Sequence, residues 1–231
     1  MTARGELAWS ERMRMTLTAI KVATVLVPQA IPGPMPGPDR ALVDIPDDPV
    51  CHAADEVART VLSPEIYRHS RRCWEWSMVL AEIDGLAPQR DALFVACMLH
   101  DLALGGSTEP CGCFAAASGE RAADLCVDLG REDIAASVSS AISGHFDPIA
   151  GRGTEDRALH GAVHLDVVGY RVREVTRAHV RTVTEAFPRS GFTAEFVRLA
   201  GREKRLRPLS TAAVMYRAGL PVLARLNPLD R

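Results

Sequence analysis

The sequence predicts an all-α protein, a helical bundle preceded by an N-terminal arm. Over most of the chain, apolar residues recur with the three- and four-residue spacing of amphipathic helices. Few stretches alternate with the two-residue period of a half-buried strand. Pro64 and Pro88 suit a first helical turn, and Gly85, Gly130 and Gly144 lie at or just beyond expected helix ends. We therefore expect a bundle without a sheet.

The N-terminal part differs from the rest. Residues 5–27 have the pattern of an amphipathic helix. Prolines interleaved with glycines follow, at positions 28, 32, 34, 36 and 38, and exclude regular structure to about Arg40. We expect a helix with a Pro/Gly-rich linker over 1–47, and a bundle with C-terminal helices over 48–231.

Within the bundle, periodicity and end signals define the expected helices. Their bounds are 53–62, 64–83, 88–102, 118–129, 131–144, 155–169, 172–187, 193–202 and 211–218. The glycine-rich stretch 105–112 is predicted to be a loop. It is interpreted equally well as a pocket rim or lid and as an ordinary connection.

Composition excludes several classes of protein. Of 231 residues, 47% are hydrophobic and 24% charged, as in an ordinary globular protein. A net charge of -2 supplies no basic excess for a nucleic-acid polymer. The apolar stretch 17–27 is interrupted by Lys21 and is too short to span a bilayer, so no membrane partner is expected.

The six cysteines lie mostly in apolar, helix-like segments of a chain too large to need disulfides. We interpret them as reduced thiols and expect a cytoplasmic protein. Cys111 and Cys113 form a C-x-C step, but no second pair completes a four-thiolate site. We interpret that step as part of a loop.

The apolar run 93–99 ends in the pair His100-Asp101. A run this apolar is buried, so it takes a histidine and a carboxylate into the interior, where unpaired polar groups are unfavourable. A divalent metal ion satisfies both if further ligands lie nearby. Imidazole and carboxylate together favour zinc, with Mn, Fe, Ni or Co as alternatives.

Two further residues are candidate ligands. His69 shares the inward stripe of its helix with Cys73 and Trp76. Asp166 lies in an otherwise apolar segment and needs a partner, either a metal ion or an arginine such as Arg171. We predict one ion bound by the four residues His69, His100, Asp101 and Asp166.

This ordered set resembles the HD superfamily of metal-dependent phosphohydrolases, over roughly residues 48–190. In that family, two histidines and two aspartates bind one divalent ion inside a helical bundle. The resemblance implies an HD-domain hydrolase that acts on a small molecule with metal-activated water. A second ion is not expected, because His160 and His164 lie too close to Asp166 to complete a dinuclear set.

A narrower resemblance is to the cyanamide hydratase-like branch. The matching steps are H-S-x-R at 69–72, A-x-x-L-H-D-L at 96–102, Phe114 with Gly119, A-I-x-x-H at 141–145 and D-V-x-G at 166–169. This resemblance implies that His145 lies near the metal, as a substrate contact or proton donor, with Asp101 as the other catalytic residue. Capping of the helix that ends at Gly144 is the alternative for His145.

One departure bears on the substrate. Many phosphohydrolases of the superfamily accommodate phosphate directly after the HD pair, where this chain has Leu102-Ala103-Leu104-Gly105. Candidate phosphate-clamp residues elsewhere are Arg68, Arg71, Arg72 and Arg121.

Three functions therefore stay open: a cyanamide hydratase-like lyase, a nucleotide phosphohydrolase, and a non-catalytic HD-fold protein that senses a ligand or serves as a scaffold. A homo-oligomer is compatible with each of them.

Overall fold

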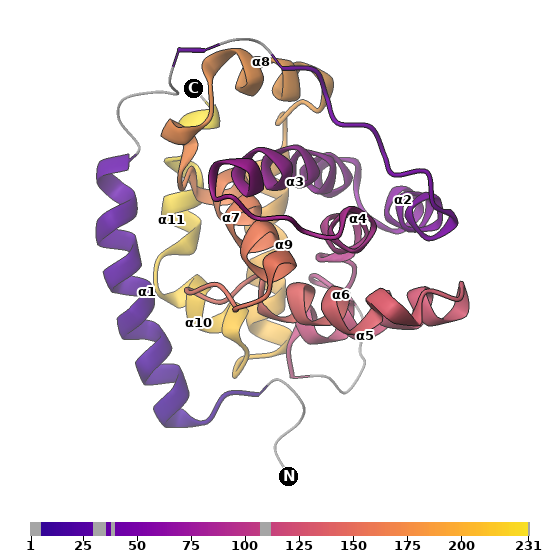
Figure 1. The fold of residues 1–231 in the computed structure, drawn as a ribbon. Helices are drawn as coiled ribbons and strands as arrows, with labels where there is room; N and C mark the ends of the chain where they lie inside the picture. Colours follow the sequence, from indigo (N-terminus) through magenta and orange to yellow (C-terminus); the bar gives the residue numbers. More distant parts are fainter. Residues whose placement is uncertain (1–5, 30–35, 38–39, 107–111, 231) are drawn as a thin grey trace.

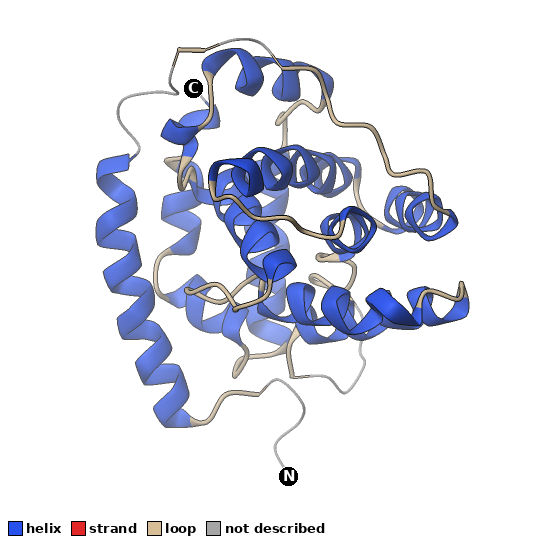
Figure 2. Cartoon of the chain, in the orientation of Figure 1, coloured by secondary structure: helices blue, strands red, loops and turns tan. Residues whose placement is uncertain are grey.

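The computed structural model describes residues 6–29, 36–37, 40–106 and 112–230. All regular structure in these residues is helical, which confirms the all-α prediction (Figures 1 and 2). The α-helices are α1 (Trp9–Gln29), α2 (Pro49–Val61), α3 (Pro64–Ile83), α4 (Arg90–Leu99), α5 (Phe114–Asp128), α6 (Glu132–Gly144), α7 (Thr154–Val168), α8 (Arg177–Ala186), α9 (Phe192–Leu206), α10 (Thr211–Arg217) and α11 (Leu220–Arg225). Two short 3-10 helices are η1 (Val172–Glu174) and η2 (Pro228–Asp230).

Helix α3 has the predicted bounds, whereas several other helices begin or end elsewhere. Helix α2 begins at Pro49, because the Asp48 carboxylate accepts a hydrogen bond of 2.9 Å from the Val50 N–H and proline occupies the first turn. The expected helix 172–187 is divided. The first part, η1, ends at Glu174, and Thr176 caps α8, with its hydroxyl accepting from the His179 N–H at 3.2 Å.

Two other differences concern the ends of helices. Helix α1 extends through Pro28 to Gln29, past the predicted end at residue 27, and it stops one residue after the proline, which lacks the N–H that continues the helical hydrogen bonding. Helices α11 and η2 follow the last helix that the sequence predicted. The centre of the predicted 105–112 loop, Cys111, and most of the proline-rich linker lie outside the described residues.

The core surrounds α4. All residues of α4 from Ala92 to Leu99 are buried, as expected for a helix that is apolar on every side. Helix α4 packs against α2, α3 and α6, α3 packs along α7, and α5 and α6 form the most extensive helix pair (Figure 1). The pair His100-Asp101 therefore follows α4 into the centre of the bundle.

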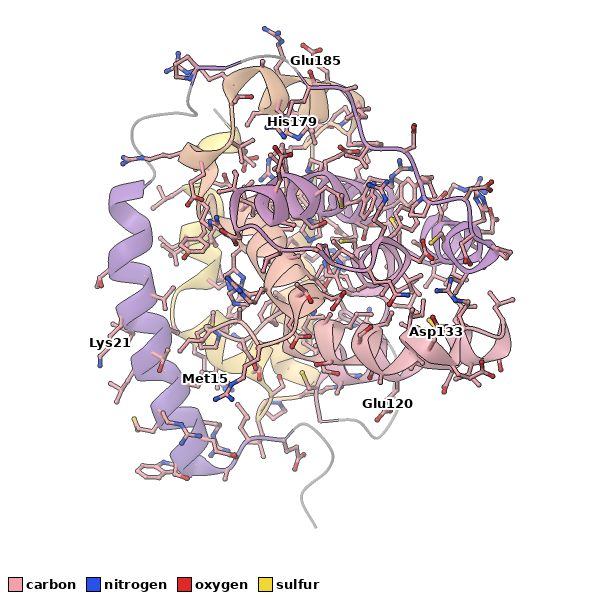
Figure 3. All side chains as sticks on the ribbon, viewed as in Figure 1. Met15, Lys21, Glu120, Asp133, His179 and Glu185 are labelled. Carbon is pink, nitrogen blue, oxygen red and sulfur yellow. The ribbon has the colours of Figure 1, made fainter. Side chains whose placement is uncertain are left out.

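Helix α1 lies at the edge of the bundle and packs chiefly on α10 (Figure 1). Among its described side chains, Ala19 alone is buried, and Trp9, Met13 and Leu17 are largely exposed. Lys21 extends from its outer side, as Figure 3 shows. No helix in the described part of the chain combines the length and hydrophobicity needed to cross a membrane.

The segment that follows the linker is fastened to α3. The carbonyl of Val43 accepts a hydrogen bond from Trp74 Nε1 at 3.2 Å, and the Val43 N–H donates to the Glu75 carboxylate at 3.1 and 3.3 Å. Trp74 and Glu75 are both buried. Two consecutive residues of α3 thus satisfy both backbone groups of Val43.

Candidate metal centre

The four predicted ligands come from three helices. His69 lies on α3, His100 and Asp101 lie in the turn that ends α4, and Asp166 lies on α7. Exposure of each is between 0 and 2%. The turn is tightened by three-residue hydrogen bonds, such as that from the Leu104 N–H to the Asp101 carbonyl at 2.9 Å. It leaves both side chains of the pair facing α3.

His69, His100 and Asp101 bring their polar atoms together. His69 Nε2 lies 3.1 Å from His100 Nε2, and these nitrogens lie 3.7 and 3.4 Å from Asp101 Oδ2. In a tetrahedral zinc site with bonds of about 2.1 Å, neighbouring ligand atoms are about 3.4 Å apart. The triangle of atoms therefore has the dimensions of one face of such a site.

The remaining ring nitrogens determine what these atoms can do. His100 Nδ1 donates to the carbonyl of Cys97 at 2.8 Å, and His69 Nδ1 donates to the Asp166 carboxylate at 2.7 Å. In the neutral imidazoles both Nε2 atoms are then unprotonated, and their lone pairs face each other. Asp101 Oδ2 also has no hydrogen-bond donor. When both rings are neutral, the centre therefore contains acceptors without a positive charge between them.

Protonation of the ligands follows from burial and neighbouring charge. Burial lowers the pKa of His69 despite its bond to Asp166. Burial would also lower the pKa of His100, but the Asp101 carboxylate outweighs it and raises that pKa. At Asp101 burial opposes ionisation, yet the imidazoles of His100 and His69 hold the pKa of the carboxyl well below its usual range. Asp101 is therefore an anion throughout the neutral pH range.

His145, which directly follows α6, faces the same space. Its Nδ1 donates to the Ile142 carbonyl at 2.5 Å, while its Nε2 is buried without a hydrogen-bond partner, 3.8 Å from Asp101 Oδ1. The ligand atoms of His100, Asp101 and His145 all lie within 4.8 Å of one another. Burial, and then the charge of His100, lowers the pKa of His145 to about 3. The neutral ring has no proton on the nitrogen that faces the centre.

Asp166 lies on the opposite side of the His69 ring. Besides His69, its carboxylate accepts from Arg72 Nε and Nη2 and from Trp76 Nε1, each at 2.8 Å, and Arg189 Nη1 is 3.1 Å away. Burial would raise the pKa of Asp166, but Arg72 and Arg189 hold it well below its usual range. The Asp166 carboxylate is thus part of a buried ion-pair network, and it does not face the triangle of His69 Nε2, His100 Nε2 and Asp101 Oδ2.

The arginine expected as the alternative partner of Asp166 lies elsewhere. Arg171 donates to Asp84 at 2.7 and 2.9 Å and to Glu174 at 3.0 Å. The buried ion pair does form, but with Arg72 and Arg189 in its place.

Cys73 adds a thiol near the histidines. Its Sγ, His69 and His100 have ligand atoms within 4.8 Å of one another, so this buried group, like that of His100, Asp101 and His145, can hold a metal ion. The Sγ lies 3.6 Å from Nδ1 and 3.7 Å from Nε2 of His69. Because it is equally distant from both nitrogens, it does not lie along the Nε2 lone pair.

Sequence reasoning missed two residues from the start of α9 and the loop before it. Phe192 stacks on His69, with centroids 4.7 Å apart and planes at 22°, and the guanidinium groups of Arg72 and Arg189 both lie 5.0 Å from the Phe192 ring centroid. Neither Arg189 nor Phe192 belongs to a recognisable motif. Only their burial in the fold reveals their role around His69.

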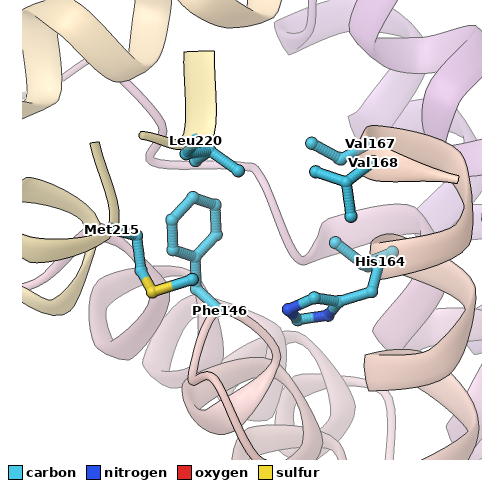
Figure 4. A pocket seen from close by; sticks show the side chains of 7 residues that line it. Phe146, His164, Val167, Val168, Met215 and Leu220 are labelled. Carbon is cyan, nitrogen blue, oxygen red and sulfur yellow. The ribbon is translucent and has the colours of Figure 1, made fainter. Parts of the chain in front are cut away.

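The two histidines of α7, His160 and His164, lie apart from the triangle of ligand atoms. His160 donates to the Asp147 carbonyl at 2.8 Å, and His164 stacks on it with centroids 4.0 Å apart. His164 borders a cavity of about 20 Å³ whose other walls include Phe146 and Met215 (Figure 4). Phe146 also packs edge-on against His145, with ring centroids 5.7 Å apart. A small, mainly apolar space therefore adjoins the residues around His145.

Comparison with known protein-family models and with curated proteins finds no match to this chain.

Proposed function

We propose that this protein is a metal-dependent HD-type hydrolase or hydratase acting on a small molecule. The proposal rests on one observation, the convergence of His69 Nε2, His100 Nε2 and Asp101 Oδ2 within 3.1 to 3.7 Å of one another. A proton shared by two of these atoms leaves the third unsatisfied, whereas a divalent ion satisfies all three. Zinc fits this donor set best, and Mn, Fe, Ni and Co also accept it.

When bound, a divalent ion lowers the pKa of water and polarises an electrophile. The chain supplies the rest. His69 and His100 would hold the ion in orientations fixed by their Nδ1–H bonds. Asp101 has two oxygens, so one can bind the ion while the other accepts a proton from the attacking water. Burial of all three excludes bulk water from the reaction.

The surroundings favour a neutral substrate over a phosphate ester. A phosphomonoester dianion calls for cationic partners, but Arg72 is fully engaged with Asp166. Arg71 Nη1 lies 3.6 Å from Asp55 Oδ1, and Arg68 Nη2 lies 3.5 Å from Glu65 Oε1. The guanidinium groups nearest to His69 on α3 are thus paired with carboxylates.

We therefore favour hydration of a small nitrile such as cyanamide. In this reaction the water oxygen bonds to the nitrile carbon while one water proton passes to the nitrogen, which gives an imidic acid. Transfer of the second proton from that oxygen to the nitrogen then gives the amide. The cavity of about 20 Å³ beside Phe146 has room for about one water molecule, so a substrate that enters from this side must be very small. The apolar lining of this cavity favours an uncharged substrate.

The test combines metal content with a substrate panel. We expect the purified protein to contain one transition-metal ion per chain and to convert cyanamide or a simple nitrile, and His100→Ala to abolish both. His52→Ala, on the exposed face of α2, is the matched control and should change neither.

Two results would overturn the proposal. Absence of stoichiometric metal from the folded wild type removes the enzyme hypothesis. Phosphate release from nucleoside mono- or triphosphates that disappears in His100→Ala replaces the hydratase with a phosphohydrolase.

A further inference from the structure

We infer that His145 is the fourth ligand of this centre and that Asp166 is a positioning residue that orients His69. The inference rests on the proposed metal centre and specifies its ligand set. The resemblance to the HD superfamily assigns Asp166 to the metal, so the geometry points to a departure from that pattern in this chain.

The Asp166 carboxylate has no capacity left for a metal ion. A carboxylate has about four lone-pair directions. Here it faces N–H groups of His69, Arg72, Trp76 and Arg189, with Arg72 contributing two. Turning Asp166 toward an ion would leave the fully buried Arg72 guanidinium without its anion, which is strongly unfavourable.

His145 has the opposite environment. Its Nε2 is buried and unpartnered and lies on the Asp101 side of the centre. The ring is held in place by the bond from Nδ1 to the Ile142 carbonyl and by edge contacts with Phe114 and Phe146, at centroid distances of 5.6 and 5.7 Å. The ring is rigid, and the free lone pair of Nε2 faces a carboxylate with no donor between them. This geometry is that of a metal ligand.

The three histidines share one arrangement. Metal-bound histidines almost always donate the second ring N–H to a carboxylate or carbonyl, which fixes the ring and its tautomer. His69 donates in this way to Asp166, His100 to the Cys97 carbonyl, and His145 to the Ile142 carbonyl. Asp166 therefore has the role toward His69 that backbone carbonyls have toward the other two.

Hydrogen bonds that hold Asp166 in place involve residues as far along the chain as Asp230. Its carbonyl oxygen accepts from Arg189 Nη1 and Asn227 Nδ2, both at 2.8 Å, and Asp230 holds Arg189 through Nε at 2.7 Å. The orientation of His69 thus depends on residues more than a hundred positions away in sequence.

The ligand set has two chemical consequences. Four protein ligands fill a tetrahedral zinc site, so an activated water would need a fifth coordination position. Three imidazoles and one carboxylate favour zinc, iron, nickel or cobalt, whereas magnesium and calcium prefer all-oxygen sites. X-ray absorption of the metal-loaded wild type counts the imidazoles directly and needs no substitution. We expect three, and a count of two would overturn the inference.

Variants test the two roles separately through the Co(II) absorption spectrum and affinity. Asn at position 166 keeps an acceptor for the His69 N–H. Asp166→Asn should therefore keep stoichiometric cobalt and the wild-type band positions, with affinity weakened roughly 10- to 100-fold. His145→Ala should shift the bands, because a ligand is lost.

Asp84→Asn is the matched control, since this carboxylate pairs with Arg171 away from the centre, and it should behave as wild type. Shifted bands in Asp166→Asn together with unshifted bands in His145→Ala would overturn the assignment while leaving the metal centre intact. Failure of the wild type to bind any metal would instead overturn the proposed function.

Discussion

Glu75 ties the stability of the fold to pH. The residue is 1% exposed, and its two carboxylate oxygens share one bifurcated hydrogen bond from the Val43 N–H. Burial raises the pKa of Glu75 from 4.5 to about 7, outweighing the Val43 bond, which acts in the opposite direction. Between these two pH values the folded chain keeps a proton that the unfolded chain has released. The free energy of unfolding must therefore fall as pH rises through this window.

The magnitude follows from the shift. A rise in the Glu75 pKa from 4.5 to about 7 lowers the free energy of unfolding by about 3 kcal/mol between pH 4.5 and pH 8. Glu75→Gln removes the titration and keeps an oxygen acceptor for the Val43 N–H. Urea unfolding of both proteins at about pH 5 and pH 8 should show Glu75→Gln gaining about 3 kcal/mol on the wild type at the higher pH.

A second glutamine variant in the same helix provides the control. Glu82 is exposed and pairs with Arg40, which lowers the pKa of its carboxyl, so Glu82→Gln should not show this gain. The burial of Asp147 also raises a pKa, to about 6, but this group is present in every variant and cancels in the comparison. Parallel pH dependences for wild type and Glu75→Gln would refute the reasoning.

Two further predictions concern packing. Phe192→Ala should lower the free energy of unfolding by about 3–5 kcal/mol, because the ring is 1% exposed and stacks on His69, and a urea titration showing a loss under about 1 kcal/mol would contradict it. In Gly119→Ala the new Cβ would lie 2.9 Å from the carbonyl oxygen of Ser139 where α5 meets α6, at a cost of about 1–3 kcal/mol. Gly144→Ala meets nothing within 4 Å and should be neutral or stabilising by up to about 1 kcal/mol, so equal melting temperatures for the two glycine variants would disprove the close-approach argument.

The parts of the fold that could be predicted depend on short-range signals. Pro64 at the start of α3 and the apolar run that ends in His100-Asp101 located the two helices that bring His69 and the pair together. The break before α8 was missed, because the apolar pattern continues through it and the capping role of Thr176 was not recognised. Local pattern thus identified helices and their inward faces more reliably than their ends.

The candidate site shows a different limit. Sequence spacing indicated that Asp166 and His69 point inward, but it could not tell which buried groups face each other. Arg72, one turn after His69, was considered only as a phosphate clamp, and Arg189 was not considered at all. Both contacts join residues separated by many positions, and no local signal encodes such a pairing.

The marginal packing of α1 divides the molecule into regions of unequal protection. Helix α4 is enclosed on every side, whereas α1 rests on the bundle through one narrow face and leaves Trp9, Met13 and Leu17 in solvent. Amide protons of α1 should therefore exchange with solvent through a sub-global opening that leaves the remaining helices intact, and those of α4 only through global unfolding. The arm can then detach and redock on its own timescale while the histidines beside α4 keep their geometry.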